Sequence, residues 1–323
     1  MTKGIRYFLG GVLTVGLLGG CEPLDDGGGG GGGPVTFTRG FAFVRESDRN
    51  VYVVDDAGDP NSPQRLTSSG GAYTPSVSRD GRSIVFVLRT AAGTALQTVP
   101  ASGGAVATLL GANDPVCVQG CFDFRMPTFS PDGRSVVFSF SKNGSSLSTL
   151  GRVNTDGSGF QELTPGGGYA YSSPSVMPDG SAVVALANNG LGSSQVAWVP
   201  LNGGAIQYSL LGNEVLAVSN RVVVSPNGAQ VAFDGRGAAN NSRIYVADLT
   251  AGRMGNPRRV TSFGSPNAQE TWPTWMRTDQ VGFLFVDTSG GDAGIYRSTV
   301  GLGPSNSVTI VVPSALEPSY GPL

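Results

Sequence analysis

The sequence predicts an all-β fold, a six-bladed β-propeller whose blades each have four strands. Similar phrases recur roughly fifty residues apart, a period typical of propeller blades: TPSVSRDGRSIVFVLR begins at Thr74 and MPTFSPDGRSVVFSFS begins at Met126. Gly and Pro are plentiful (50 and 21 residues) and charged residues are sparse (14%), which is typical of short strands joined by turns. Unrelated hairpins in a β-sandwich are the alternative, but they would not share Pro, Asp, Gly and Phe positions at one period.

Each repeat contains four strand types in a fixed order. The first type has Pro near its start and leads into a turn that we expect to be a tight type I′ hairpin; the turn positions are Gly81, Gly133, Gly180, Gly228 and Asp279. The second type is an apolar run that suits a strand buried on both faces, at 41–44, 84–88, 136–140, 231–233 and 281–286. The third type resembles VYVVDD, at 51–55, 95–100, 147–153, 196–200, 244–249 and 295–299. The fourth is short, at 64–67, 106–110, 161–164, 206–209, 258–261 and 308–312.

The repeats are offset at the two ends of the propeller. The folded chain opens on a second-type strand, FAFV, and ends on LEPSYGPL, which reads as a first-type strand without a blade of its own. We expect this last strand to complete the first blade, because that arrangement closes the ring and leaves no exposed sheet edge.

The repeat phrase xPxxSPDGxxVxF, followed by IYVxDxxxG and RxLT, resembles the repeats of TolB-like six-bladed propellers. The resemblance runs from Phe41 to Tyr320, with departures at Arg79 (for Pro), at Asn227 (for Asp) and in the fifth copy, which lacks the Gly. It implies a propeller of the kind that serves as a protein-docking platform, as an accessory domain beside peptidases, or occasionally as a lyase or hydrolase. TolB also carries an α/β domain before its propeller, so we expect the likeness to cover the propeller alone.

The N-terminus has the pattern of a secretory signal. Lys3 and Arg6 precede an apolar stretch that is too short to span a membrane comfortably, and small residues lead to Cys21. This segment resembles the bacterial lipobox, which implies that Cys21 becomes the lipidated first residue; an ordinary signal peptide that contains a Cys is the alternative. A retention signal of the common type would place Asp after this Cys, whereas the chain has Glu22, so the resemblance favours the outer membrane.

These observations predict three parts: a lipoprotein signal peptide (1–20), a lipidated Cys with a Gly-rich tether (21–34) and the propeller (35–323). The run Gly27–Gly33 is too flexible to pack and lacks the Lys and Ser/Thr of a phosphate-binding loop. We therefore expect a lipid-anchored monomer in the bacterial envelope, at the outer membrane and facing the periplasm.

The two other cysteines, Cys117 and Cys121, lie close together in the sequence. An oxidising periplasm favours a disulfide between them. A metal site is the alternative, but two thiols in a chain without His make a poor zinc ligand set.

The chain has no His, which excludes Ser-His-Asp and Cys-His catalytic sets and His-based metal centres. We expect no cofactor and no metal, and the net charge of −2 argues against nucleic acid as a partner. A paired-carboxylate mechanism stays open, with candidates Asp123, Glu214, Glu270, Asp287, Asp292 and Glu317. The turn residues Asp80, Asp132 and Asp179 are expected to bond their own backbone; calcium is the alternative, but one Asp per blade makes a poor cage.

A binding site is expected where the first-type strands line the channel. The residues just ahead of the shared Pro position should form a ring at the mouth on the side of the loops that join successive blades: Thr74, Met126, Ser173, Arg221, Trp272 and Glu317. Their chemical variety suits recognition, with Trp272 and Arg221 as anchors, although Arg221 and Glu317 can also simply neutralise each other. Trp275 is expected in the core.

The predicted function is a binding scaffold at the outer membrane or in the periplasm, without enzymatic activity. It would recognise an envelope protein, or a polysaccharide or peptidoglycan-associated partner. The alternative is a carboxylate-dependent glycan or lactone hydrolase or lyase that works in the propeller channel.

Overall fold

A computed structural model describes residues 37–323 except 118–119, 167, 191–193, 210–216, 237–240, 263–266, 290–292, 302 and 306–307. The chain divides into two units, 1–33 and 34–323, and every described residue belongs to the second unit. Cys21 and the predicted signal and tether lie outside the described residues. In the described part no helix is long and apolar enough to cross a membrane.

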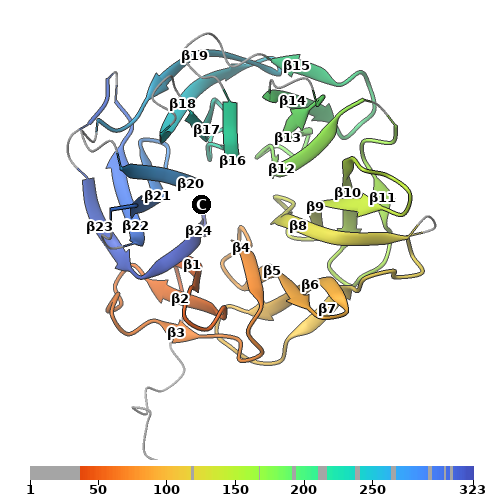
Figure 1. The fold of residues 1–323 in the computed structure, drawn as a ribbon, viewed down its shortest axis with the longest axis horizontal. Coiled ribbons are helices and arrows are strands. Elements are labelled where there is room, and N and C mark those ends of the chain that lie inside the picture. The colour runs from red at the N-terminus through yellow and green to blue at the C-terminus, as the bar shows by residue number, and fades with distance from the viewer. Residues whose placement is uncertain are drawn as a thin grey trace, which may run out of the picture. The chain divides into compact units, whose positions relative to one another are not determined.

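The described strands form six four-stranded antiparallel sheets, arranged as the blades of a propeller (Figure 1). Blade 1 consists of β24 (Ala315–Gly321), β1 (Gly40–Arg45), β2 (Val51–Asp55) and β3 (Gln64–Arg65). Blade 2 consists of β4 (Ala72–Val77), β5 (Ser83–Thr90), β6 (Gly93–Pro100) and β7 (Ala107–Leu110). Blade 3 consists of β8 (Cys121–Phe129), β9 (Ser135–Lys142), β10 (Ser148–Asn154) and β11 (Gln161–Glu162).

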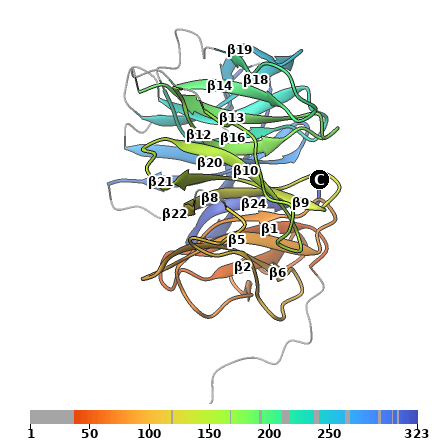
Figure 2. The same cartoon turned by 90° about the vertical axis from the view of Figure 1, so that its right-hand side faces the viewer.

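The second half of the ring repeats this plan. Blade 4 consists of β12 (Ala170–Val176), β13 (Ala182–Asn188), β14 (Ser194–Pro200) and β15 (Gln207–Ser209). Blade 5 consists of β16 (Ala217–Val224), β17 (Gln230–Arg236), β18 (Ser242–Thr250) and β19 (Arg253–Arg259). Blade 6 consists of β20 (Ala268–Arg277), β21 (Gln280–Asp287), β22 (Ala293–Thr299) and β23 (Val308–Pro313). In each blade the first strand of the list is innermost, and Figure 2 shows the blades from the side.

The ring closes as predicted from the offset of the repeats. The last strand, β24, pairs with β1 in antiparallel register, with Gly40 opposite Gly321 and Phe41 opposite Tyr320. The rings of Phe41 and Tyr320 also meet edge to face, with centroids 5.0 Å apart. Blade 1 therefore joins the two ends of the propeller in one sheet.

The core consists of six apolar clusters, each shared by two neighbouring blades. The second strand of each blade supplies both sides, because alternate side chains point to opposite faces. In β13, for example, Val184 packs towards blade 5 and Val183 packs towards blade 3, and both are fully buried. This confirms the prediction of second-type strands that are buried on both faces.

The hairpins after the inner strands differ from the predicted type I′ turns. In blade 2 the N–H of Gly81 donates to the carbonyl of Ser78, and Gly81 alone of the turn residues has a positive φ (72°). The turn prediction is therefore wrong, since a type I′ turn needs positive φ at both central residues. The carboxylate of Asp80 accepts bonds from the Arg82 N–H and the Ser78 hydroxyl, which stabilises the longer loop. Similar turn-stabilising bonds involve Asp132, Asp179 and Asn227.

The outermost strand of blade 5 begins earlier than predicted. Here β19 starts at Arg253, opposite Thr250, and the two residues between them, Ala251 and Gly252, both have positive φ (49° and 79°). That combination is the type I′ hairpin, found between β18 and β19 instead of after the inner strand.

Candidate functional site

Each inner strand has an irregular register with its neighbour where it passes the channel. Five of the six predicted ring residues lie at these irregularities with φ between 48° and 55°: Thr74, Met126, Ser173, Trp272 and Glu317. The left-handed region costs a non-glycine residue about 1–2 kcal/mol, and such residues are concentrated at functional sites. The repeat therefore holds one strained residue at the same level in five blades.

The ring residues meet at the channel axis. A cavity of about 10 Å³ is lined by Thr74, Met126, Ser173, Arg221 and Trp272, close to the space that one water molecule needs. Glu317 joins them through Oε2, which accepts a 2.5 Å hydrogen bond from the backbone N–H of Thr74. The structure thus brings the six residues together, but as a constriction of the channel. Their role in binding stays a prediction.

Arg221 reaches the ring by a different backbone path. In blade 5 the register jumps from Val218 to Val222 on β16 while β17 advances only from Gly235 to Phe233. The fully buried carboxylate of Asp234 accepts the N–H groups of Asn220 and Arg221, at 3.2 and 2.7 Å. A side chain therefore replaces backbone pairing at this point. The corresponding residues on the other second strands carry no charge: Val44, Val87, Ser139, Leu186 and Leu284.

Burial governs the charges at the ring. It raises the pKa of Asp234 and of Glu317, although the hydrogen bonds to each carboxylate oppose the shift. Burial also lowers the pKa of Arg221 to about 10, against the attraction of Asp234 and Glu317. Glu317 forms its ion pair with Arg49, at 3.4 Å, while Nη1 of Arg221 donates to the carbonyl of Pro318 at 2.6 Å. The expected neutralisation of Glu317 by Arg221 is therefore not a direct ion pair.

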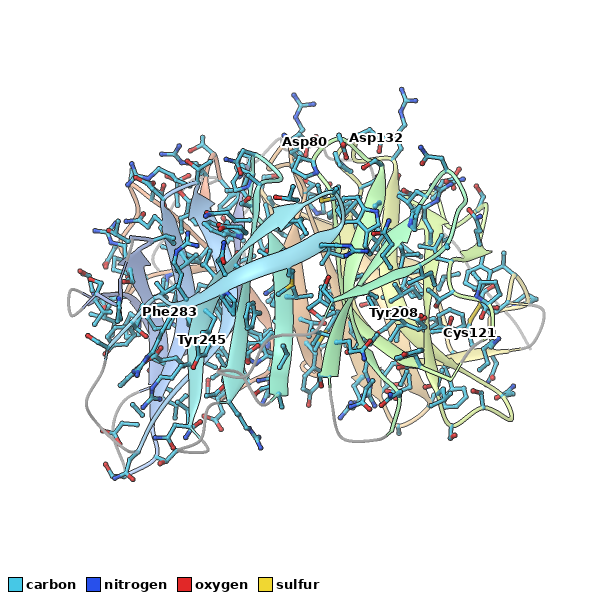
Figure 3. The ribbon with its side chains drawn as sticks, turned by 90° about the horizontal axis from the view of Figure 1, so that it is seen from above. Asp80, Cys121, Asp132, Tyr208, Tyr245 and Phe283 are labelled. Atoms are coloured by element: carbon cyan, nitrogen blue, oxygen red, sulfur yellow. A yellow bond between two sulfur atoms is a disulfide. The ribbon has the colours of Figure 1, made fainter. Side chains whose placement is uncertain are left out.

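A larger space lies on the hairpin side of the ring, the face that carries Asp80 and Asp132 in Figure 3. We call this cavity of about 140 Å³ the channel chamber; its lining includes the turn residues Ser78, Arg79, Ser130 and Ser225 and, at the ring, Arg221. Trp272 lines the ring cavity but is not part of the chamber lining.

Hydroxyl groups fasten the inner strands to one another along the chamber. Five of the six inner strands carry Ser or Thr directly after the ring-adjacent Pro, at Ser76, Thr128, Ser175, Thr274 and Ser319. Three of these hydroxyls accept the backbone N–H of the next blade at 3.0–3.1 Å: Ser175 from Val224, Thr274 from Tyr320 and Ser319 from Val77. The sequence analysis missed them and Asp234; the repeated Pro-Ser or Pro-Thr pair was the available signal.

The carboxylates proposed for catalysis have separate local partners. Asp123 pairs with Arg125, Asp287 accepts bonds from Ser289, and the fully buried Glu270 accepts the N–H of Ile244 and lies 3.7 Å from Arg243. Glu214 and Asp292 lie outside the described residues. No group of three or more acidic or sulfur ligands in the described ranges is placed to hold a metal ion.

Trp275 lies in the core, as predicted. It is 1% exposed in the cluster between blades 5 and 6, and its indole N–H donates to the carbonyl of Val223 at 3.1 Å.

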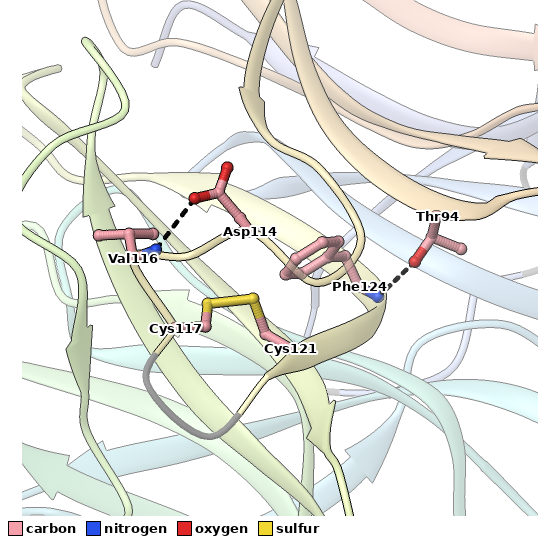
Figure 4. The surroundings of a disulfide bond; sticks show 6 residues. All are labelled: Thr94, Asp114, Val116, Cys117, Cys121 and Phe124. Carbon is pink, nitrogen blue, oxygen red and sulfur yellow. Dashed lines mark hydrogen bonds between the residues drawn. A yellow bond between two sulfur atoms is a disulfide. The ribbon is translucent and has the colours of Figure 1, made fainter.

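The predicted disulfide between Cys117 and Cys121 is confirmed (Figure 4). Both cysteines are buried in the cluster between blades 2 and 3. Just after them, the N–H of Phe124 donates to the hydroxyl of Thr94, at 2.8 Å. The bridge thus stands where the chain enters blade 3 from blade 2.

Comparisons with known proteins identify the fold. No family model and no curated protein sequence matches the chain. TolB from Acinetobacter baumannii superposes with a TM-score of 0.64 at 18% identity, covering 89% of this chain and 67% of that one. A putative TolB from Agrobacterium tumefaciens gives 0.60 at 14% identity, covering 86% and 90%. An oligogalacturonate lyase from Vibrio parahaemolyticus gives 0.54 at 18% identity, covering 82% and 75%. The chain has the TolB-like six-bladed propeller fold.

Proposed function

We propose that this protein is a binding module of the bacterial cell envelope that recognises a protein or a cell-wall polymer through the ring at its channel. The observation that carries the proposal is the ring itself, where five strained residues and Arg221 meet. Trp272 is the anchor, because it is large, partly exposed and held at φ 55°. Buried aromatic and Arg anchors commonly dominate interfaces. The TolB-like fold supports this reading, since propellers of this repeat type serve as docking platforms.

The test is quantitative capture from envelope extract and co-sedimentation with peptidoglycan. Trp272→Ala should weaken capture by more than about tenfold, the scale of a hot spot, and should leave the melting temperature nearly unchanged. Trp198→Ala is the matched control, because Trp198 is also partly exposed but packs at the outer part of the propeller, between blades 4 and 5. Equal capture by wild type and Trp272→Ala, or equal loss in both variants, would reject the ring as the binding site.

The second candidate is a carboxylate-dependent enzyme that acts in the channel. Asp234 and Glu317 are two carboxylates whose pKa burial raises, and both attract the Arg221 charge. Carboxylates of raised pKa can serve as general acids. The oligogalacturonate lyase that shares the fold keeps this candidate open. A panel of glycan and lactone substrates tests it: turnover lost in Asp234→Asn and Glu317→Gln would favour the enzyme.

The envelope location rests on the N-terminal signal and Cys21. We expect the protein to fractionate with the outer membrane through a lipid on Cys21. Cys21→Ser should release it into the soluble fraction, whereas a variant that still sediments with the outer membrane would reject the lipid anchor.

A further inference from the structure

We propose that the channel chamber is a binding site for a small oxyanion, held between Arg221 at the ring and Arg79 at the hairpin face. The ligand class is a hydroxylated acid of a few carbons, whose carboxylate meets the guanidinium groups. This site goes beyond the proposed function, which concerns the ring and a macromolecular partner.

Arg221 is a partly buried cation with unused donors. A guanidinium carries five N–H donors, and among the described residues this one makes a single hydrogen bond, from Nη1 to the carbonyl of Pro318. Among the described residues no carboxylate lies within ion-pair distance of it; Asp234 instead binds the backbone of Arg221. Burial penalises the charge and lowers its pKa to about 10, which still leaves the group cationic at neutral pH. A cation in these surroundings favours an anionic ligand.

A second cation stands at the opening of the same chamber. Arg79 occupies a hairpin turn position of blade 2 at which three other blades have Pro: Pro131, Pro178 and Pro226. Its side chain is exposed, lines the chamber and donates from Nη1 to the carbonyl of Pro178 in blade 4 at 3.1 Å. The Arg79 side chain therefore reaches from the hairpin of blade 2 to the hairpin of blade 4.

Several departures from the repeat thus lie at or next to the channel chamber. Arg79 replaces a turn Pro, Arg221 is followed by Val222 where the other five blades have Pro, and Asp234 replaces an uncharged residue. Asp234 is a positioning residue: it holds the backbone of Arg221 without pairing with the guanidinium. This bond holds the backbone of Arg221 at the place where the residue lines the chamber.

The chamber also offers free hydroxyl groups. The hydroxyls of Ser76 and Thr128 line it, and neither has a hydrogen-bond partner in the part of the chain that the structure describes. Those of Ser175, Thr274 and Ser319 already bind neighbouring N–H groups. Free hydroxyls both donate and accept, so they suit a ligand that carries hydroxyl groups beside its charge.

The size of the chamber limits the ligand. A volume of about 140 Å³ corresponds to roughly ten water-sized spheres. A hydroxylated four-carbon acid such as L-malate has a comparable number of non-hydrogen atoms, whereas a polymer chain would have to pass the ring, whose cavity is about 10 Å³. Carboxylate and phosphate share the chemistry that a guanidinium recognises, so the experiment distinguishes the two.

The test is calorimetric titration of the purified protein with L-malate, inorganic phosphate and erythritol, a neutral molecule of similar size. We expect L-malate to bind and erythritol not to bind. Arg221→Gln should weaken the affinity for L-malate by at least tenfold. Arg79→Gln should weaken it severalfold. Arg134→Gln, an exposed hairpin Arg that does not line the chamber, should bind like wild type. Trp272→Ala should also bind like wild type, which separates this site from the proposed ring function.

Each result decides the proposal. Phosphate bound in place of L-malate, with the same dependence on Arg221, supports the site and assigns it to a phosphate group. Equal binding of L-malate and erythritol, or L-malate binding that neither Arg variant weakens, overturns it. So does the absence of any L-malate or phosphate binding at about 20 mM, a concentration well above a millimolar Kd. If Arg221→Gln does not fold, Arg79→Gln decides alone: unchanged affinity then overturns the site.

Discussion

Oε2 of Glu317 in the last strand accepts the backbone N–H of Thr74 in blade 2, at 2.5 Å. Both residues have left-handed backbone conformations, with φ of 52° and 48°. Oε1 of the same carboxylate pairs with Arg49, at 3.4 Å. One largely buried acid therefore links the closing strand to two earlier parts of the ring.

Glu317→Gln should change how stability depends on pH. Burial raises the folded-state pKa of Glu317 above its ordinary value of 4.5, against the bonds from Thr74 and Arg49. The folded state then binds the proton more tightly than the unfolded state. Protonation of Glu317 therefore stabilises the fold, and this stabilisation is complete below pH 4.5 and is lost as pH rises through the folded pKa. We expect the Gln variant to be more stable than wild type at pH 7 by about 1 kcal/mol, and similar at pH 4.

Urea unfolding across this pH range measures the effect. Glu46→Gln, at an exposed position, is the control and should reproduce the wild-type profile. If the free energy of unfolding of Glu317→Gln changed with pH in parallel to that of wild type, Glu317 would not be the cause of the pH dependence.

Asp55→Asn should have the opposite pH signature. Burial opposes ionisation of Asp55, but bonds from the Thr38 hydroxyl and from the N–H groups of Thr38, Arg39 and Ala57 outweigh it and lower the pKa to about 2. This stabilisation is present above the unfolded value near 3.8 and is lost as pH falls towards 2. We expect the variant to lose about 1–2 kcal/mol at pH 7 and to converge with wild type in strong acid. Asp279→Asn, at an exposed hairpin position, should change little; a constant deficit of Asp55→Asn at every pH would contradict the assignment.

Thr274→Val should destabilise the propeller more than Thr128→Val. The two residues occupy equivalent positions, but only the Thr274 hydroxyl accepts an inter-blade bond, from the Tyr320 N–H at 3.0 Å. Replacing it with a methyl group leaves a buried donor unpaired, which costs about 1–3 kcal/mol. Denaturation midpoints of the two isosteric variants measure the difference. Equal midpoints would mean that the hydroxyl bonds between blades do not contribute to stability.

Removal of the Cys117–Cys121 bridge should lower stability only modestly. The bridge closes a loop with a sequence separation of 4, so its entropic contribution should be below the roughly 3 kcal/mol estimated for a fifteen-residue loop. We expect thiol titration of the unfolded mature protein to find no free thiol from this pair before reduction. Two reactive thiols in protein purified without reductant would reject the bridge.

The repeat phrase was sufficient to predict the blades because it encodes local chemistry. Pro, Asp-Gly and an apolar run specify a strand, a turn and a strand within sixteen residues, as in the stretch from Met126 to Ser141. The closing role of β24 followed from the offset of the first and last strands. The disulfide followed from sequence proximity and the expected compartment.

Other features depend on contacts that no single repeat contains. Asp234 appears in the sequence as a polar residue at the end of an apolar run, and its role is visible only when β16 bulges towards it. The ion pair of Glu317 with Arg49 joins residues that are distant in the chain. The sequence predicted that the six ring residues lie at the same height in the channel. The left-handed backbone of five of them is visible only in the structure. The turn type was also not predicted: the Asp80 carboxylate accepts the Arg82 N–H and stabilises a longer loop.

The pairing of Gly40 with Gly321 has a consequence for the order of folding. The other described strand pairings join consecutive strands of a blade, which are close in the chain, and can form as soon as both strands exist. Blade 1 must wait for β24, so β1 keeps an open hydrogen-bonding edge until the last strand arrives. Bringing together such distant segments is entropically slow, and we expect this step to form late. A nascent or truncated chain that lacks β24 would present that edge to other chains and would be prone to pair with them.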